Sequence, residues 1–244
     1  MLGCSIDVQC KGDNGEPWDL NSTSKRNKGI RLVADTKPAL VVGSPMYTMF
    51  SSLQNLNTNT NTPEHEQQVK QATSHIEFCI VLYYMQAKAC RYYLHEHPQS
   101  ATYWKLPKVT EFINKYKPML VKANMCAFGM IATDAQGTGL VYKPTMFMTS
   151  SQSIADQLNK QCLCVHRHVQ LMNGRAKHAA IYPDALCDAI CKGIRVQLDR
   201  DDLIARMPRT NIGWIRNINS LDIGSIHNDE ADASWYFDDV TGAP

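Results

Sequence analysis

The sequence predicts an α/β fold with a mostly parallel sheet and helices on both of its faces. Short apolar runs bounded by proline and glycine alternate along the chain with longer segments of helical periodicity. This alternation favours parallel strands, because each helix crosses the sheet and returns the chain in the same direction. With 244 residues, 44% of them apolar, the chain is long enough to bury a core.

In the first half of the chain we expect three strands separated by two helices. Residues 5–6 predict a short first strand and residues 22–36 a helix. The β-branched run 39–42 predicts a buried strand. The helix 62–89 begins with Thr-Pro-Glu, in which the threonine caps the helix and the proline suits its first turn. Residues 92–96 predict the next strand.

The second half of the chain continues the alternation and closes with a pair of strands. The expected elements are a helix at 107–116, a strand at 119–121 that residues 127–129 extend, a loop at 131–142, a strand at 145–149, a helix at 153–160 and a last helix that begins at 182. The closing pair of strands can form a hairpin, which would add one antiparallel strand at the edge of the sheet.

Charge is distributed unevenly along the chain. All 25 lysine and arginine residues lie at or before Arg216, whereas six of the 23 acidic residues follow it. We therefore interpret residues 1–200 as one α/β domain and residues 201–244 as an acidic, mostly irregular tail or linker. A basic body with an acidic tail is typical of proteins that bind nucleic acid, so we expect DNA or RNA among the partners.

The sequence predicts an intracellular protein of the nucleus or cytoplasm. No apolar run approaches the roughly 18 residues of a membrane-spanning helix, so no membrane association is expected. The first residues do not resemble a secretory signal. The nine cysteines are an odd number, which argues against a disulfide framework and for reduced thiols.

Polar residues follow the ends of the predicted strands. Asp7 follows the strand at 5–6, Ser44-Pro45 follows the strand at 39–42, and Glu96 closes the strand at 92–96. Ligands of parallel α/β sheets bind at the carboxyl ends of the strands. We therefore expect Ser44, Pro45, Glu96 and a further acid, Asp19, to lie at one edge of the sheet.

These stretches resemble the catalytic domain of cytosine-C5 DNA methyltransferases, which use S-adenosylmethionine. More closely, the chain resembles a methyltransferase-like segment of retrotransposon polyproteins. The stretches that carry the resemblance lie at residues 17–19, 43–54, 94–98, 143–145 and 174–187. The resemblance implies a class I S-adenosylmethionine-methyltransferase-like (Rossmann-like) fold whose first strand is missing, in a polyprotein whose other domains are partners.

The resemblance also assigns roles to catalytic positions. In the family, a cysteine thiolate after a proline attacks the flipped-out cytosine, and a glutamate contacts the base. Pro45 and Glu96 match two of these positions, but Tyr47 stands where the nucleophile is expected. Tyrosine, with a pKa of about 10, does not replace a thiolate at neutral pH. We therefore expect a degenerate domain without methyltransferase activity.

The cofactor positions are incomplete. By resemblance, Asp7 would hold the cofactor ribose, Asp19 would lie near its adenine, and Ser44 would also belong to the cofactor site. The glycine-rich loop that cradles the methionine end of S-adenosylmethionine is missing, because Gly137-Thr138-Gly139 is not in a strand–loop–helix unit. We therefore expect no appreciable binding of S-adenosylmethionine.

Two other functions stay open. Ser44-Pro45-Met46-Tyr47 resembles the Ser-Pro-Pro-Tyr turn of amino-methyltransferases, in which the aromatic ring stacks on the flipped base. Alternatively, the chain is a non-enzymatic nucleic-acid-binding or scaffolding segment. The candidate nucleic-acid contacts are Arg91, His97 and Arg175. In an extended strand, His95 and His97 point to the face opposite Glu96, where a packing role is favoured.

One segment contains alternating cysteine and histidine. It includes Cys162, Cys164, His166 and His168, and one residue separates each candidate ligand from the next. In a strand the ends of this segment would lie about 20 Å apart, too far for one ion. In a curled loop, two or three of these side chains could bind a metal. We interpret the segment as a turn and expect no metal, with these four residues as weak candidate ligands.

Overall fold

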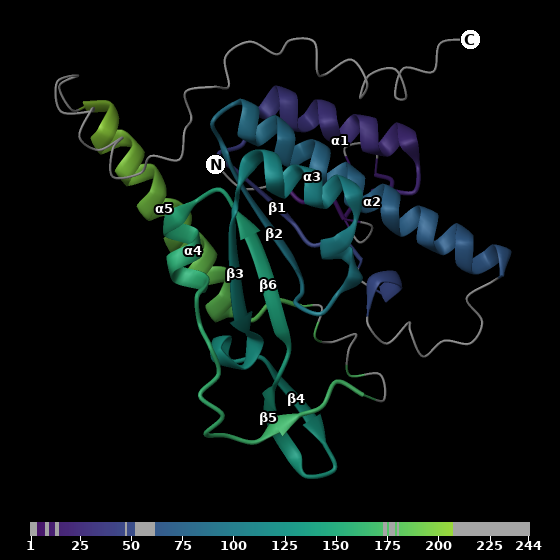
Figure 1. Ribbon diagram of the computed structural model, residues 1–244, viewed down its shortest axis with the longest axis vertical. Coiled ribbons are helices and arrows are strands. Elements are labelled where there is room, and N and C mark those ends of the chain that lie inside the picture. Colours follow the sequence, from purple (N-terminus) through teal and green to yellow (C-terminus); the bar gives the residue numbers. More distant parts are fainter. Residues whose placement is uncertain are drawn as a thin grey trace.

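The structure, a computed structural model, describes residues 4–7, 10–12, 15–46, 48–51, 62–172, 175, 179 and 181–206. Over these residues it is a mixed α/β fold with two sheets (Figure 1). The α-helices are α1 (Thr23–Thr36), α2 (Pro63–Lys88), α3 (Pro107–Tyr116), α4 (Gln152–Leu158) and α5 (Asp184–Arg206). The strands are β1 (Leu40–Gly43), β2 (Tyr92–Pro98), β3 (Met119–Asn124), β4 (Ile131–Asp134), β5 (Gly137–Val141), β6 (Pro144–Thr149) and β7 (His168–Val169). The 3-10 helices are η1 (Thr48–Phe50), η3 (Thr102–Lys105) and η4 (Met125–Phe128).

The main sheet has the strand order β1-β2-β6-β3. β1 and β2 are parallel, and β6 is antiparallel to both β2 and β3. We expected a mostly parallel sheet with the antiparallel strand at an edge. This was wrong, because β6 lies inside the sheet, so that only the β1–β2 pairing of the main sheet is parallel. The chain leaves β3 at its carboxyl end, forms the β4–β5 hairpin there, and re-enters between β2 and β3 from the same end. That path makes β6 antiparallel to its neighbours.

Helices cover both faces of the main sheet, as expected (Figure 1). On β2, Tyr93 packs with α2 and α3, whereas the next residue, Leu94, packs with α4 and α5. This alternation follows from the two-residue period of a strand. The helix α1 packs on α2, where Gly29 allows the ring of Phe78 to approach the α1 backbone closely.

The predicted helices and the strands at 39–42, 92–96, 119–121 and 145–149 are confirmed to within a few residues. Other predictions were wrong. Residues 5–6 form no strand, residues 127–129 do not extend β3, and residues 131–142 form a hairpin rather than a loop. The hairpin turn depends on Gly137, whose φ of +99° is unfavourable for other residues. Helix α4 is capped by Ser151 rather than Ser153.

The last helix runs further than expected. Residues 201–206, which we placed at the start of an irregular tail, are the final turns of α5. The rest of the predicted tail, 207–244, lies outside the described residues. Within the described ranges, no helix combines the length and apolar character that crossing a bilayer requires.

A close contact at the carboxyl end of β1 generates a test of the packing. A Cβ atom on Gly43 would overlap the hydroxyl of Tyr83, which hydrogen-bonds to His95 Nδ1 at 2.9 Å. We expect Gly43→Ala to lower the free energy of unfolding by about 2 kcal/mol, as overpacking does. Urea unfolding measures this loss.

The matched control for this test is Tyr83→Phe, which removes the hydroxyl. The double variant Gly43→Ala/Tyr83→Phe has no such overlap. Its loss of unfolding free energy should therefore be about 1 kcal/mol smaller than the sum of the losses in the two single variants. If the losses of unfolding free energy were strictly additive, the Tyr83 hydroxyl would not be what prevents a larger residue at position 43.

Candidate functional site

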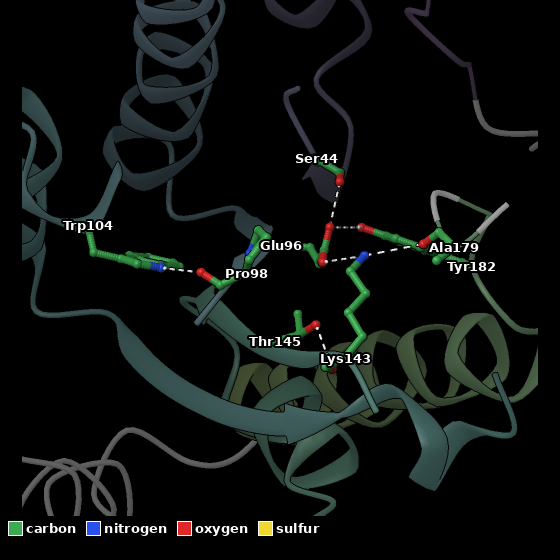
Figure 2. Close-up of polar contacts among 8 residues, drawn as sticks. All are labelled: Ser44, Glu96, Pro98, Trp104, Lys143, Thr145, Ala179 and Tyr182. Atoms are coloured by element: carbon green, nitrogen blue, oxygen red, sulfur yellow. Dashed lines mark hydrogen bonds and ion pairs between the residues drawn. The ribbon is translucent and has the colours of Figure 1, made fainter. Parts of the chain in front are cut away.

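Glu96 is the centre of a buried polar cluster at the carboxyl end of the main sheet. Its side chain comes from β2 and lies on the face covered by α4 and α5 (Figure 2). Glu96 is only 3% exposed. Ser44, in the turn after β1, donates a hydrogen bond from Oγ to Glu96 Oε2 at 2.6 Å. The neighbouring parallel strands β1 and β2 therefore bring together the two residues that the sequence placed at one edge.

Two further residues complete this cluster. Lys143 Nζ, from the loop before β6, lies 3.5 Å from Glu96 Oε1 and donates to the carbonyl oxygen of Ala179 at 3.3 Å. Tyr182, just before α5, donates to Glu96 Oε2 at 3.4 Å (Figure 2). Burial raises the pKa of Tyr182 well above its ordinary value, and the charge of Glu96 raises it further. Tyr182 therefore stays a neutral donor at physiological pH.

The cluster leaves Glu96 with little capacity for an external ligand. Its Oε2 accepts hydrogen bonds from Ser44 and Tyr182. Its Oε1 accepts no hydrogen bond among the described residues and faces only the Lys143 ammonium group at 3.5 Å. Ser44 is exposed, whereas Glu96 is buried. A base bound at Oε2 would have to displace Ser44 or Tyr182. In the described conformation, the Glu96 carboxyl group is bound by other residues of the chain.

His95 and His97 lie on the opposite face of β2. Both are fully buried and stack on one another, with ring centroids 5.6 Å apart, and both pack against Tyr103. The predicted packing role is confirmed, and the expected contact of His97 with nucleic acid is excluded in this conformation by its burial. Burial lowers the pKa of His97 to about 3 and that of His95 well below 6.5.

The structure does not bring the predicted cofactor acids to this cluster. Asp19 precedes α1, where its Oδ1 accepts a hydrogen bond from the backbone N–H of Asn21. Asp7 lies in a bend, because no strand forms before it, and is exposed. Pro45 adjoins Ser44 and is partly buried. Tyr47 lies outside the described residues.

The predicted basic contacts are spread over the molecule. Arg91 precedes β2, at the end of that strand opposite to Ser44, and donates from Nε to Gln86 Oε1 at 2.8 Å. Arg175 donates from Nε to the carbonyl oxygen of Gln170 at 2.8 Å. Neither contact places these cations beside Glu96. Their role toward nucleic acid stays a prediction.

The cysteine–histidine segment curls, so three of its four candidate ligands meet. The ligand atoms of Cys162, His166 and His168 lie close together, and Cys126 joins them in place of Cys164. Cys126 could not be predicted from a local pattern, because 36 residues separate it from the segment. The roles of Lys143 and Tyr182 were not predicted either, although both residues lie in stretches that carry the resemblance.

No known protein-family model matches this chain, and no curated protein or solved structure is detectably similar to it. The geometry of its own residues therefore has to carry the functional inference.

The buried ion pair can be tested through stability. Lys143→Met keeps the length and the apolar stem of the side chain but leaves the Glu96 charge without its cation. Breaking a buried pair in this way should cost about 3 kcal/mol of unfolding free energy. Denaturant unfolding checks this.

The double variant Glu96→Gln/Lys143→Met is the control. It removes both charges, so it should be more stable than Lys143→Met alone. If both variants are equally unstable, the loss comes from packing and not from the unpaired carboxylate.

The buried histidines predict a pH dependence. Because their pKa values are lowered in the folded state, the unfolded chain binds more protons below about pH 6.5, and stability should fall as the pH decreases from there toward 3. Each histidine contributes a slope of about 1.4 kcal/mol per pH unit. His97→Phe, which keeps an aromatic ring among its neighbours, should reduce the slope by that amount between pH 6 and 5, as measured by urea unfolding.

Above pH 7 the free energy of unfolding should depend on pH in the same way for the parent chain and for His97→Phe. The reason is that histidine is neutral there in both the folded and the unfolded state. Parallel profiles below pH 6 as well would contradict the buried, neutral state of His97.

Proposed function

We propose that this chain is a methyltransferase-like domain of a mobile-element polyprotein that does not transfer methyl groups and acts as a scaffolding or nucleic-acid-binding segment. The observation that carries the proposal is the set of contacts within the chain that bind the Glu96 carboxyl group. By resemblance, Glu96 stands at the base-contacting position, but its Oε2 already accepts hydrogen bonds from Ser44 and Tyr182, and Lys143 Nζ lies 3.5 Å from Oε1.

The arrangement of the sheet supports the methyltransferase-like part of the proposal. Ser44 follows β1, and Glu96 lies two residues before the end of the adjacent parallel strand β2, in line with the resemblance to cytosine-C5 methyltransferases. The antiparallel β6 lies between β2 and β3, which run parallel to each other.

The nature of the residue at the nucleophile position supports the absence of chemistry. C5 methylation needs a thiolate to attack the ring before the methyl group can be accepted. Tyr47 stands in that position. A phenol with a pKa of about 10 is protonated at neutral pH and is a poor substitute. At this position the covalent step therefore has no thiolate to start it.

The loops that follow the described strands do not form the glycine-rich loop that binds the cofactor in the family. Among the described residues, no strand is followed by a glycine-rich loop that leads into a helix. Gly137 and Gly139 lie in the β4–β5 hairpin. Without such a loop, the backbone N–H groups that hold a charged cofactor end are not gathered in one place.

The test is transfer of a labelled methyl group from S-adenosylmethionine to duplex and single-stranded DNA. We expect no label from the parent chain, and none from Tyr47→Cys, because restoring a thiol does not restore cofactor binding. Isothermal titration with S-adenosylmethionine provides the second measurement, in which no micromolar binding is expected.

Each positive result has a distinct meaning. Label on an exocyclic amino group from the parent would replace the proposal with amino-methyltransferase chemistry at Ser44-Pro45-Met46-Tyr47. Label on cytosine C5 from Tyr47→Cys alone would show that only the nucleophile is missing. Glu96→Gln serves as the control, since any true base-dependent transfer should be weakened by it.

A further inference from the structure

A second cluster lies beyond the end of β3, outside the Glu96 cluster. It consists of Cys126 in η4, Cys162 and His166 in the segment after α4, and His168 at the start of β7. One ligand atom from each of the four residues lies within 4.8 Å of the others. Two thiols and two imidazoles are the ligand set of many structural zinc sites.

The distances within this cluster match a single small cation. A tetrahedral ion with Zn–S of about 2.3 Å and Zn–N of about 2.05 Å separates a sulfur from a nitrogen ligand by about 3.5 Å. Cys162 Sγ lies 3.6 Å from His166 Nε2 and 3.3 Å from His168 Nε2. The side chains are therefore spaced as ligands of one ion would be.

The backbone conformation of this segment directs the candidate ligands toward one point. His166 and His168 are two residues apart and point to the same side, whereas Arg167 between them points away and donates to Asp134 Oδ2 at 2.8 Å. The backbone N–H of Cys164 donates to Cys162 Sγ at 3.2 Å. Such N–H groups support a thiolate ligand from outside the coordination sphere.

Apolar burial does not explain why the segment adopts this curled form. Leu163 and Val165 point to solvent and are 81% and 83% exposed. Cys164 has a φ of +55°, which is uncommon for a residue other than glycine. A segment with exposed apolar side chains and a strained turn needs another interaction to hold it, and an ion shared by four side chains would provide that interaction.

We propose that Cys126, Cys162, His166 and His168 bind one Zn²⁺ in a closed, tetrahedral structural site. Binding releases the thiol protons of both cysteines, while the imidazoles bind as neutral ligands. All four positions come from the protein, so the site is structural rather than catalytic. It joins the end of β3 to β7, which pairs with β5 in the second sheet, of strand order β4-β5-β7. The site is independent of any methyl transfer.

The test is the metal content of the full chain, purified without a histidine tag from zinc-supplemented medium. We expect about one zinc per chain by plasma mass spectrometry. X-ray absorption on the same sample should show two sulfur ligands at about 2.3 Å and two nitrogen ligands at 2.0–2.1 Å. Replacement by Co²⁺ should produce the visible bands of tetrahedral cobalt with thiolate ligands.

The variants are Cys126→Ser and His168→Asn, with Cys164→Ser as the matched control. Cys164 is a neighbouring thiol that does not belong to the group of close ligand atoms. The first two variants should lose most of the zinc, and Cys164→Ser should retain it. If a variant fails to fold, the absorption spectrum of the parent chain still decides the ligand set.

Other outcomes would overturn the proposal. Zinc far below one per chain in the folded parent would show that thiol–imidazole hydrogen bonds alone hold the cluster. A loss of two mass units, with Cys126 linked to Cys162, would show a disulfide. Equal loss of zinc from Cys164→Ser would show a different ligand set.

Discussion

The burial of one carboxylate constrains how most of this fold is assembled. A buried carboxyl group such as Glu96 requires partners, because removing a polar or charged group from water without compensation costs several kcal/mol. Its partners come from the turn after β1, the loop before β6 and the segment before α5. These contacts with Glu96 hold the three segments in place relative to β2. Lys143 also donates a hydrogen bond to the carbonyl oxygen of Ala179, so the position of Ala179 depends on the same cluster.

The strand β2 carries opposite chemistry on its two faces. One face presents Glu96 to the charged cluster, and the other presents His95 and His97 to a layer of aromatic rings. The histidines remain neutral because they are buried, so they pack as polar aromatic residues. Gly43 completes this arrangement, since only a residue without a side chain leaves room for the Tyr83 hydroxyl that reaches His95.

Both side-chain clusters lie toward the carboxyl ends of β1, β2 and β3. This is the end at which parallel α/β sheets normally bind ligands, because the loops there are free to vary. Here the end is held by internal interactions: the Glu96 cluster near β1 and β2, and the cysteine–histidine group after β3. The scaffolding role that we propose does not require ligand exchange at this end, so the internal contacts there do not conflict with it.

The sequence by itself determined the local elements and the juxtaposition of Ser44 with Glu96. Helices such as α2 and α3 follow from caps, prolines and apolar periodicity, and the ends of adjacent parallel strands must meet at one edge. It also predicted that His95 and His97 oppose Glu96, since a strand has a period of two. Only the tertiary structure placed β6 between β2 and β3. It also paired Lys143 with Glu96 and brought Cys126 close to a segment that begins 36 residues later. These pairings join residues far apart in the chain, and they depend on the path of the whole backbone rather than on any local pattern.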